Sequence, residues 1–122
     1  MARRDVTGAI DMAHLERFTG GDPALTEEVL GLFAEQASLW TRLLDPAGPD
    51  QAWRDAAHTL KGAALGVGAF GLAEACEAAE TAAEHGPAAR DLALARVRLQ
   101  VDSVLHDVAA WRHELALQSL KG

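Results

Sequence analysis

The 122-residue chain has a single cysteine, four prolines and no tyrosine. One cysteine, Cys76, excludes an internal disulfide and favours a reducing compartment. No apolar run approaches the ~18 residues that a membrane span requires, and no apolar segment follows the N-terminal Met-Ala-Arg-Arg as it would in a secretory signal. We therefore expect a cytoplasmic protein that does not bind membranes.

Basic residues are scarce as well, because 11 Lys and Arg stand against 18 Asp and Glu and give a formal net charge of −7. The chain has no basic stripe of the kind that nucleic-acid binding needs, so nucleic acid is not expected as a partner. Repeats, low-complexity tracts and linkers are missing too, and the length predicts one domain, residues 1–122, around a single core. A Gly-rich nucleotide loop is also absent, which argues against an autonomous kinase.

No strand-like alternation of useful length occurs, whereas apolar residues recur every three or four positions over most of the chain. Capping residues divide this pattern into a short helix from Asp11 to about Phe18 and longer helices over 22–44, 49–67, 70–85 and from Pro87 onward. The prediction is an all-α protein, an antiparallel up-down four-helix bundle with a short extra N-terminal helix, acting as a monomer. Residues 1–10 lack periodicity and are expected to be frayed.

The same periodicity predicts which residues form the core. On the second helix, the inner face is assigned to Leu25, Val29, Phe33, Trp40, Leu43 and Leu44. On the fourth helix it is assigned to Leu72, Cys76, Ala79 and Ala83, with Cys76 read as a small core residue. On the last helix it is assigned to Leu94, Val97, Val101, Val104, Val108, Trp111 and Leu115.

One histidine of the third predicted helix falls on the polar side. The apolar stripe of this helix consists of Trp53, Ala56, Ala57, Leu60, Ala63, Ala64 and Val67. At roughly 100° per residue, His58 lies about 140° from Trp53 and should face solvent. Its imidazole has an unperturbed pKa of about 6.5, so a substantial neutral fraction can act as a nucleophile toward a phosphoryl group.

The neighbours of His58 on the solvent face suit that chemistry. Lys61 can stabilise phosphoryl oxygens as a point charge, and Arg54 either helps or steers an acidic partner. Gly62 costs roughly 0.5–1 kcal/mol relative to alanine inside a helix, a cost that close approach of another molecule over the imidazole would offset. Leu65 offers that molecule an apolar contact. The three residues Arg54, Gly62 and Leu65 are therefore predicted to dock a partner.

The sequence around His58 also resembles a known family. His58-Thr59-Leu60-Lys61-Gly62-Ala63-Ala64 resembles the H-x-L-K-G-[SA]-A signature of the histidine-containing phosphotransfer (HPt) domain of bacterial two-component phosphorelays. The resemblance spans nearly the whole chain and continues at Leu15, Gly20-Gly21-Asp22, Gly68-Ala69, Leu72, Cys76 and Glu80.

This resemblance implies a phosphocarrier rather than an enzyme. His58 would accept a phosphoryl group from a receiver-domain aspartate and pass it to another receiver, in a response regulator or a hybrid histidine kinase. Mg²⁺ is expected on the partner receiver domain, and no cofactor on this chain. A histidine-kinase dimerisation helix pair fits less well, because Thr59 rather than an acidic residue follows His58 and the next proline after His58 is Pro87. The remaining alternative is a non-catalytic helical module that docks receiver domains without phosphorylation.

Two further residues are left with open roles. Glu80 stands at a position that contacts the neighbourhood of the active histidine in some members of the family, and it could contact Lys61 or His58. Gln36 is interpreted first as a satisfied core amide and second as a side chain reaching toward the His58 helix. The other histidines, at 14, 85, 106 and 113, have no spacing that gathers three metal ligands, so no metal site is expected.

Overall fold

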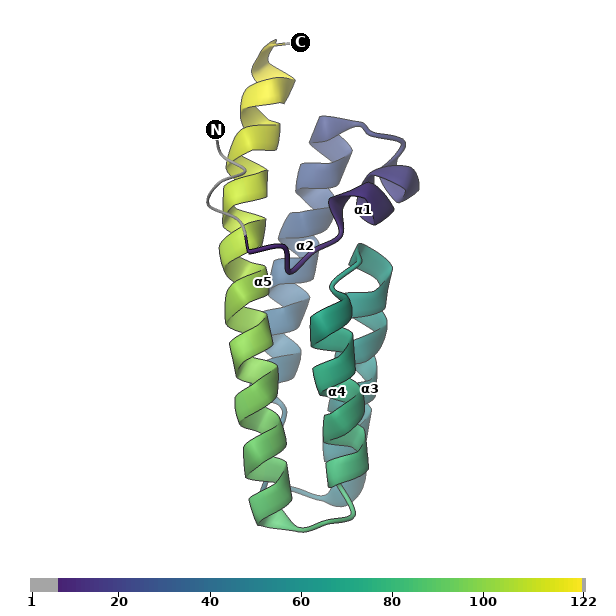
Figure 1. Ribbon diagram of the computed structural model, residues 1–122, viewed down its shortest axis with the longest axis vertical. Coiled ribbons are helices and arrows are strands. Elements are labelled where there is room, and N and C mark those ends of the chain that lie inside the picture. Colours follow the sequence, from purple (N-terminus) through teal and green to yellow (C-terminus); the bar gives the residue numbers. More distant parts are fainter. Residues whose placement is uncertain (1–6, 122) are drawn as a thin grey trace.

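The computed structural model describes residues 7–121, which form five helices and no strands. A short α1 (Met12–Thr19) precedes four longer helices that run alternately up and down: α2 (Pro23–Arg42), α3 (Asp50–Val67), α4 (Phe70–Ala82) and α5 (Pro87–Lys121) (Figure 1). Both α2 and α4 pack against α3 and α5, so the four helices occupy the corners of a square. The predicted antiparallel bundle with an extra N-terminal helix is confirmed. No described helix is long and apolar enough to cross a membrane.

The helix boundaries follow the capping residues. The Asp11 carboxylate accepts a hydrogen bond from the His14 N–H (3.1 Å), and the Asp22 carboxylate accepts one from the Ala24 N–H (3.0 Å). These bonds satisfy N–H groups that have no partner inside α1 and α2. The C-terminal boundaries differ slightly from the prediction, because α2 ends at Arg42 and α4 at Ala82.

The core is apolar and rich in alanine, which lets the helices approach closely. The inner faces predicted for the third, fourth and last helices are buried, except that Ala63 and Trp111 are only partly so. Cys76 is fully buried among them, as predicted. The fully buried large side chains of α3 to α5 are Trp53, Leu60, Leu72, Val97 and Val104.

The inner face predicted for the second helix is wrong at two positions. Leu25 and Leu43 are 43% and 48% exposed, whereas Phe33 and Leu44 are buried and Val29 and Trp40 only partly buried. The buried residues of α2 are Thr26, Leu30, Phe33 and Ala37. Leucines lie on two sides of this helix. Apolar residues alone therefore do not show which side of the helix faces the core. The interior instead takes one other leucine, Leu30, and the Thr26 hydroxyl, which lies 2.6 Å from that of Thr19.

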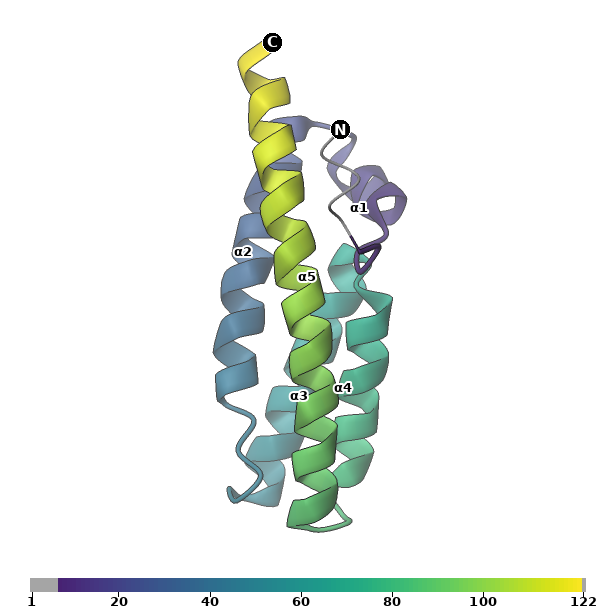
Figure 2. The same cartoon turned by 60° about the vertical axis from the view of Figure 1, so that its left-hand side comes forward.

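The chain before α1 is held against the bundle. The N–H groups of Thr7 and Ala9 donate to the buried carboxylate of Asp107 on α5, at 2.6 and 2.9 Å. The Asp11 N–H donates to the Gly68 carbonyl at the end of α3 (2.9 Å). The expectation of a frayed N-terminus therefore fails for residues 7–10, while residues 1–6 lie outside the described part of the chain. Figure 2 shows α1 at the end of the bundle where α3 ends and α4 begins.

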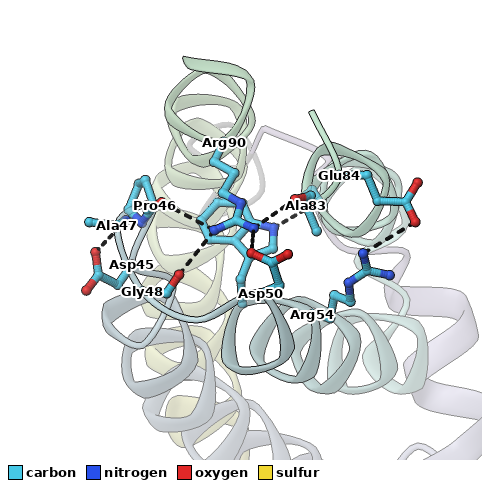
Figure 3. A network of polar contacts seen from close by, with 11 residues as sticks. Asp45, Pro46, Ala47, Gly48, Asp50, Arg54, Ala83, Glu84 and Arg90 are labelled. Atoms are coloured by element: carbon cyan, nitrogen blue, oxygen red, sulfur yellow. Dashed lines mark hydrogen bonds and ion pairs between the residues drawn. The ribbon is translucent and has the colours of Figure 1, made fainter. Parts of the chain in front are cut away.

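The opposite end of the bundle is organised by one arginine. Arg90, only 5% exposed, donates from Nη1 to the carbonyls of Pro46 (3.4 Å) and Gly48 (3.2 Å) in the α2–α3 connection. From Nη2 it donates to the Ala83 carbonyl at the end of α4 (2.7 Å) and pairs with Asp50 in the first turn of α3. Figure 3 shows the guanidinium between these segments. One cation thus joins both loops at this end.

Trp53 provides the apolar side of the same network. The Arg90 guanidinium carbon lies 5.7 Å from the centre of the Trp53 ring, within the range of a cation–π contact. The Trp53 indole N–H donates to the carbonyl of Ala79 on α4 (2.7 Å). Arg90 precedes Leu94 by four residues and so continues the apolar spacing of α5. That spacing places Arg90 on the inner face of α5, one turn before the first residue of the predicted inner face, Leu94.

Replacing Arg90 by methionine should therefore destabilise the fold. The substitution leaves carbonyls of the two connections without donors, a loss of about 1–3 kcal/mol for buried polar groups. For a domain of this size this corresponds to a fall of roughly 3–15 °C in the thermal midpoint, measurable by circular dichroism. The matched control is Arg98→Met, on the exposed side of the same helix, which should melt near the wild-type temperature. Equal melting of the two variants would contradict the assigned role of Arg90.

Candidate functional site

His58 projects from the outer face of α3, near the middle of the helix. Trp53 and Leu60, with 1% and 0% exposure, anchor the opposite face in the core. The side chain of His58 is 73% exposed, as the helical wheel predicted. The imidazole is therefore open to a second molecule without any opening of the bundle.

A glutamate of the neighbouring helix lies beside the imidazole. One carboxylate oxygen of Glu80, Oε1, is 3.0 Å from Lys61 Nζ and 3.6 Å from His58 Nδ1. Lys61 and Glu80 are both largely covered, with side chains 24% and 28% exposed. The contact that the sequence left open for Glu80 thus exists to both residues, and it joins α4 to the His58 face of α3.

This ion pair further favours the charged form of Lys61. The hydrogen bond to Glu80, together with the negative charge of that carboxylate, raises the pKa of Lys61 above its usual value. A raised lysine pKa means that the ammonium persists through neutral pH and is lost only above the ordinary lysine range. The face that carries the imidazole therefore presents a charged ammonium group at neutral pH, paired with the Glu80 carboxylate.

The predicted docking residues occupy three different environments. Arg54 reaches toward the turn that follows α4, where its Nη2 lies 3.4 Å from Glu84 Oε1 (Figure 3). A Cβ added at Gly62 would meet no atom within 4 Å, so the surface beside His58 is open there. Leu65 is 46% exposed. All three lie on the solvent-facing side of α3, and their role in docking remains a prediction.

The first interpretation of Gln36 is wrong. Its side chain is exposed on α2, and its Oε1 accepts a hydrogen bond from the Trp40 indole N–H (2.9 Å). Gln36 is thus a surface residue that accepts the hydrogen bond of a tryptophan indole one turn away, rather than a core amide. Because the inner face of α2 is rotated from the predicted one, Gln36 lies outside the packed interior.

The buried Cys76 lies one helical turn before Glu80 on α4. Burial, with a smaller contribution from the Glu80 charge, raises the pKa of its thiol to about 12. The thiol is therefore uncharged at neutral pH and supplies no second nucleophile beside His58. Among residues 7–121, no group of three or more His, Cys, Asp or Glu side chains could hold a metal ion.

Comparison with known proteins gives the family. A model of the Hpt domain matches residues 24–116. The chain belongs to the Hpt domain family. Its fold is similar to the crystal structure of the histidine phosphotransferase ShpA from Caulobacter crescentus, with 51% identity, a TM-score of 0.74, and coverage of 93% of this chain and 99% of that one. No curated protein sequence matches.

A more distant structure shares the same architecture. A putative histidine-containing phosphotransfer protein from rice is 22% identical, with a TM-score of 0.78 over 91% of this chain and 84% of that one. At this identity the likeness concerns the fold alone. The Hpt assignment confirms the resemblance seen in the sequence and makes this bundle a phosphotransfer carrier in the broad sense.

Two glycines of the Hpt site region should respond oppositely to alanine. Gly62→Ala places its Cβ in open space on a helix and should stabilise the fold by up to about 1 kcal/mol. Gly68→Ala serves as the contrast, because Gly68 has φ +83° and its added Cβ would lie 2.9 Å from the Asp11 carbonyl oxygen. That variant should lose at least about 1 kcal/mol. Urea unfolding measures both, and a destabilised Gly62→Ala would contradict the open surface beside His58.

Proposed function

We propose that His58 carries the phosphoryl group, accepting it from an aspartyl phosphate of a receiver domain and passing it to the aspartate of another. The observation that carries this proposal is the exposed imidazole beside the Lys61–Glu80 ion pair, with no side chain at Gly62 to obstruct a docked protein. The same arrangement makes the chain a phosphocarrier without kinase activity of its own.

The transfer needs only positioning and charge. Nε2 of the neutral imidazole attacks phosphorus in line, a P–N bond forms, the acyl P–O bond breaks, and the receiver aspartate leaves as a carboxylate. The ring keeps its proton on Nδ1, the nitrogen that faces Glu80 Oε1 at 3.6 Å. The negative charge of Glu80 stabilises the positive charge that the ring gains. Transfer to the second receiver reverses these steps.

Lys61 acts on the phosphoryl oxygens. Its ammonium lies on the same face as the imidazole and is oriented by Glu80 at 3.0 Å. A positioned cation stabilises the loose, anionic transition state of phosphoryl transfer. Mg²⁺ belongs in this proposal to the partner receiver, whose acidic pocket would hold it next to the reacting aspartate.

The first test replaces the nucleophile. His58→Gln should abolish labelling of the protein by a phosphorylated receiver domain, tested over a panel of purified receivers with Mg²⁺ present. In the wild type, the label should be removed by acid and retained in alkali, as expected for a phosphorylated imidazole. Because the His58 side chain is 73% exposed, the variant should melt within about 2 °C of wild type.

The control for this variant is His113→Gln, which changes another exposed histidine and should leave labelling intact. Persistent acid-labile label on His58→Gln would disprove the role of His58. If wild-type protein binds receivers but takes no label from any of them, the non-catalytic docking module is the correct reading.

The second test adds bulk beside the imidazole. Gly62→Gln should reduce the rate of phosphoryl transfer from the receiver at least about tenfold, a docking penalty of ~1.4 kcal/mol, because its side chain occupies the open surface. Gly62→Ala is the matched control with a small side chain and should transfer near the wild-type rate. Phosphoramidate, a small phosphoryl donor, should still label His58 in Gly62→Gln, since no docked protein is involved. Normal transfer from the receiver to Gly62→Gln would remove the steric argument.

A further inference from the structure

A groove between α3 and α4 adjoins the proposed phosphoryl site. It is lined by Lys61 and Leu65 from α3 and by Phe70, Ala73, Glu74 and Glu77 from α4. Its apolar walls remain open to solvent, since Leu65 and Phe70 are 46% and 43% exposed. Lys61 belongs both to this groove and to the His58 face, so the groove is continuous with that face.

The glutamates on one side of α4 and of the turn after it differ in whether they have an ion-pair partner. Glu84 is paired with Arg54 at 3.4 Å, and Glu80 with Lys61 at 3.0 Å. Glu74 and Glu77 continue the same side of the helix, are exposed, and have no ion-pair partner among residues 7–121. The groove therefore has apolar walls and a rim on which Glu74 and Glu77 outnumber Lys61, a cation that is already paired with Glu80.

We propose that this groove binds a lysine or arginine side chain of the receiver domain that docks on His58, and that the contact selects among receivers. The proposal rests on the function proposed above. Such a side chain matches both features, because its aliphatic stem packs on Leu65 and Phe70 while its charged end reaches Glu74 and Glu77. No other common side chain combines an apolar stem of this length with a positive charge.

Other occupants fit less well. A purely apolar side chain would remove the Glu74 and Glu77 carboxylates from water without compensation, which costs free energy. An acidic side chain would be repelled by both carboxylates. Receivers that lack a cation at this point therefore bind less tightly. The unfavourable contact with the Glu74 and Glu77 carboxylates would discriminate between otherwise similar receivers.

The test neutralises the rim without changing its shape. The double variant Glu74→Gln/Glu77→Gln is compared with wild type, using as phosphoryl donor the receiver that labels wild-type His58 fastest. The expected result is an increase of about tenfold in KM for the phosphorylated receiver at low salt, with the transfer rate at saturation unchanged. The effect should shrink as salt is raised, because rim charges are screened.

The matched control is Glu16→Gln/Asp91→Asn, which removes the same number of charges from exposed sites on α1 and α5. It should leave KM near wild type. An unchanged KM in the groove variant, an equal change in the control, or a lower rate at saturation would each overturn the inference. Labelling of His58 by phosphoramidate should be the same in all variants. Failure of wild-type His58 to take label from any receiver would instead refute the proposed function.

Discussion

The buried guanidinium of Arg90 is the constraint on which the rest of the bundle depends. It donates to carbonyls of the α2–α3 connection and of the end of α4, and it pairs with Asp50 at the start of α3. Peptide carbonyls at loop and helix ends carry negative partial charge, so a buried cation satisfies several of them at once. Because it binds both the first turn of α3 and the end of α4, it fixes the register of these two helices at that end of the bundle. This register decides which side chains of the two helices face each other.

The functional face is a consequence of that register. Along the α3–α4 contact, Arg54 meets Glu84 and Lys61 meets Glu80, and His58 lies between them. The imidazole is thus exposed to solvent yet held in a defined electrostatic environment. Since the core lies on the opposite side of α3, a phosphoryl group bound to His58, as we propose, would not disturb the packing of the bundle. Gly62 leaves the surface beside the imidazole open, and the docking that we propose would use this surface.

Local pattern predicted much of the molecule, and its failures have identifiable causes. The caps at Asp11 and Asp22 and the exposure of His58 depend only on residues within a few positions of each other, and these predictions hold. The inner face of α2 was misassigned because leucines lie on two of its sides, and only its neighbours decide which side is buried. Gln36 was misplaced for the same reason. Asp107, which holds the segment before α1, gave no local signal, since its partners lie about a hundred residues away.

The sequence by itself determined the helical periods, the helix ends, the outward direction of His58 and the family signature around it. These properties arise from contacts between residues one turn apart and from the chemistry of single side chains. The tertiary structure alone decided that Glu80 pairs with Lys61 beside the imidazole, that Arg90 closes one end, and that Glu74 and Glu77 rim an apolar groove. Each of these depends on the distance between side chains on different helices. That distance is set by how the four helices pack, which no single helix specifies.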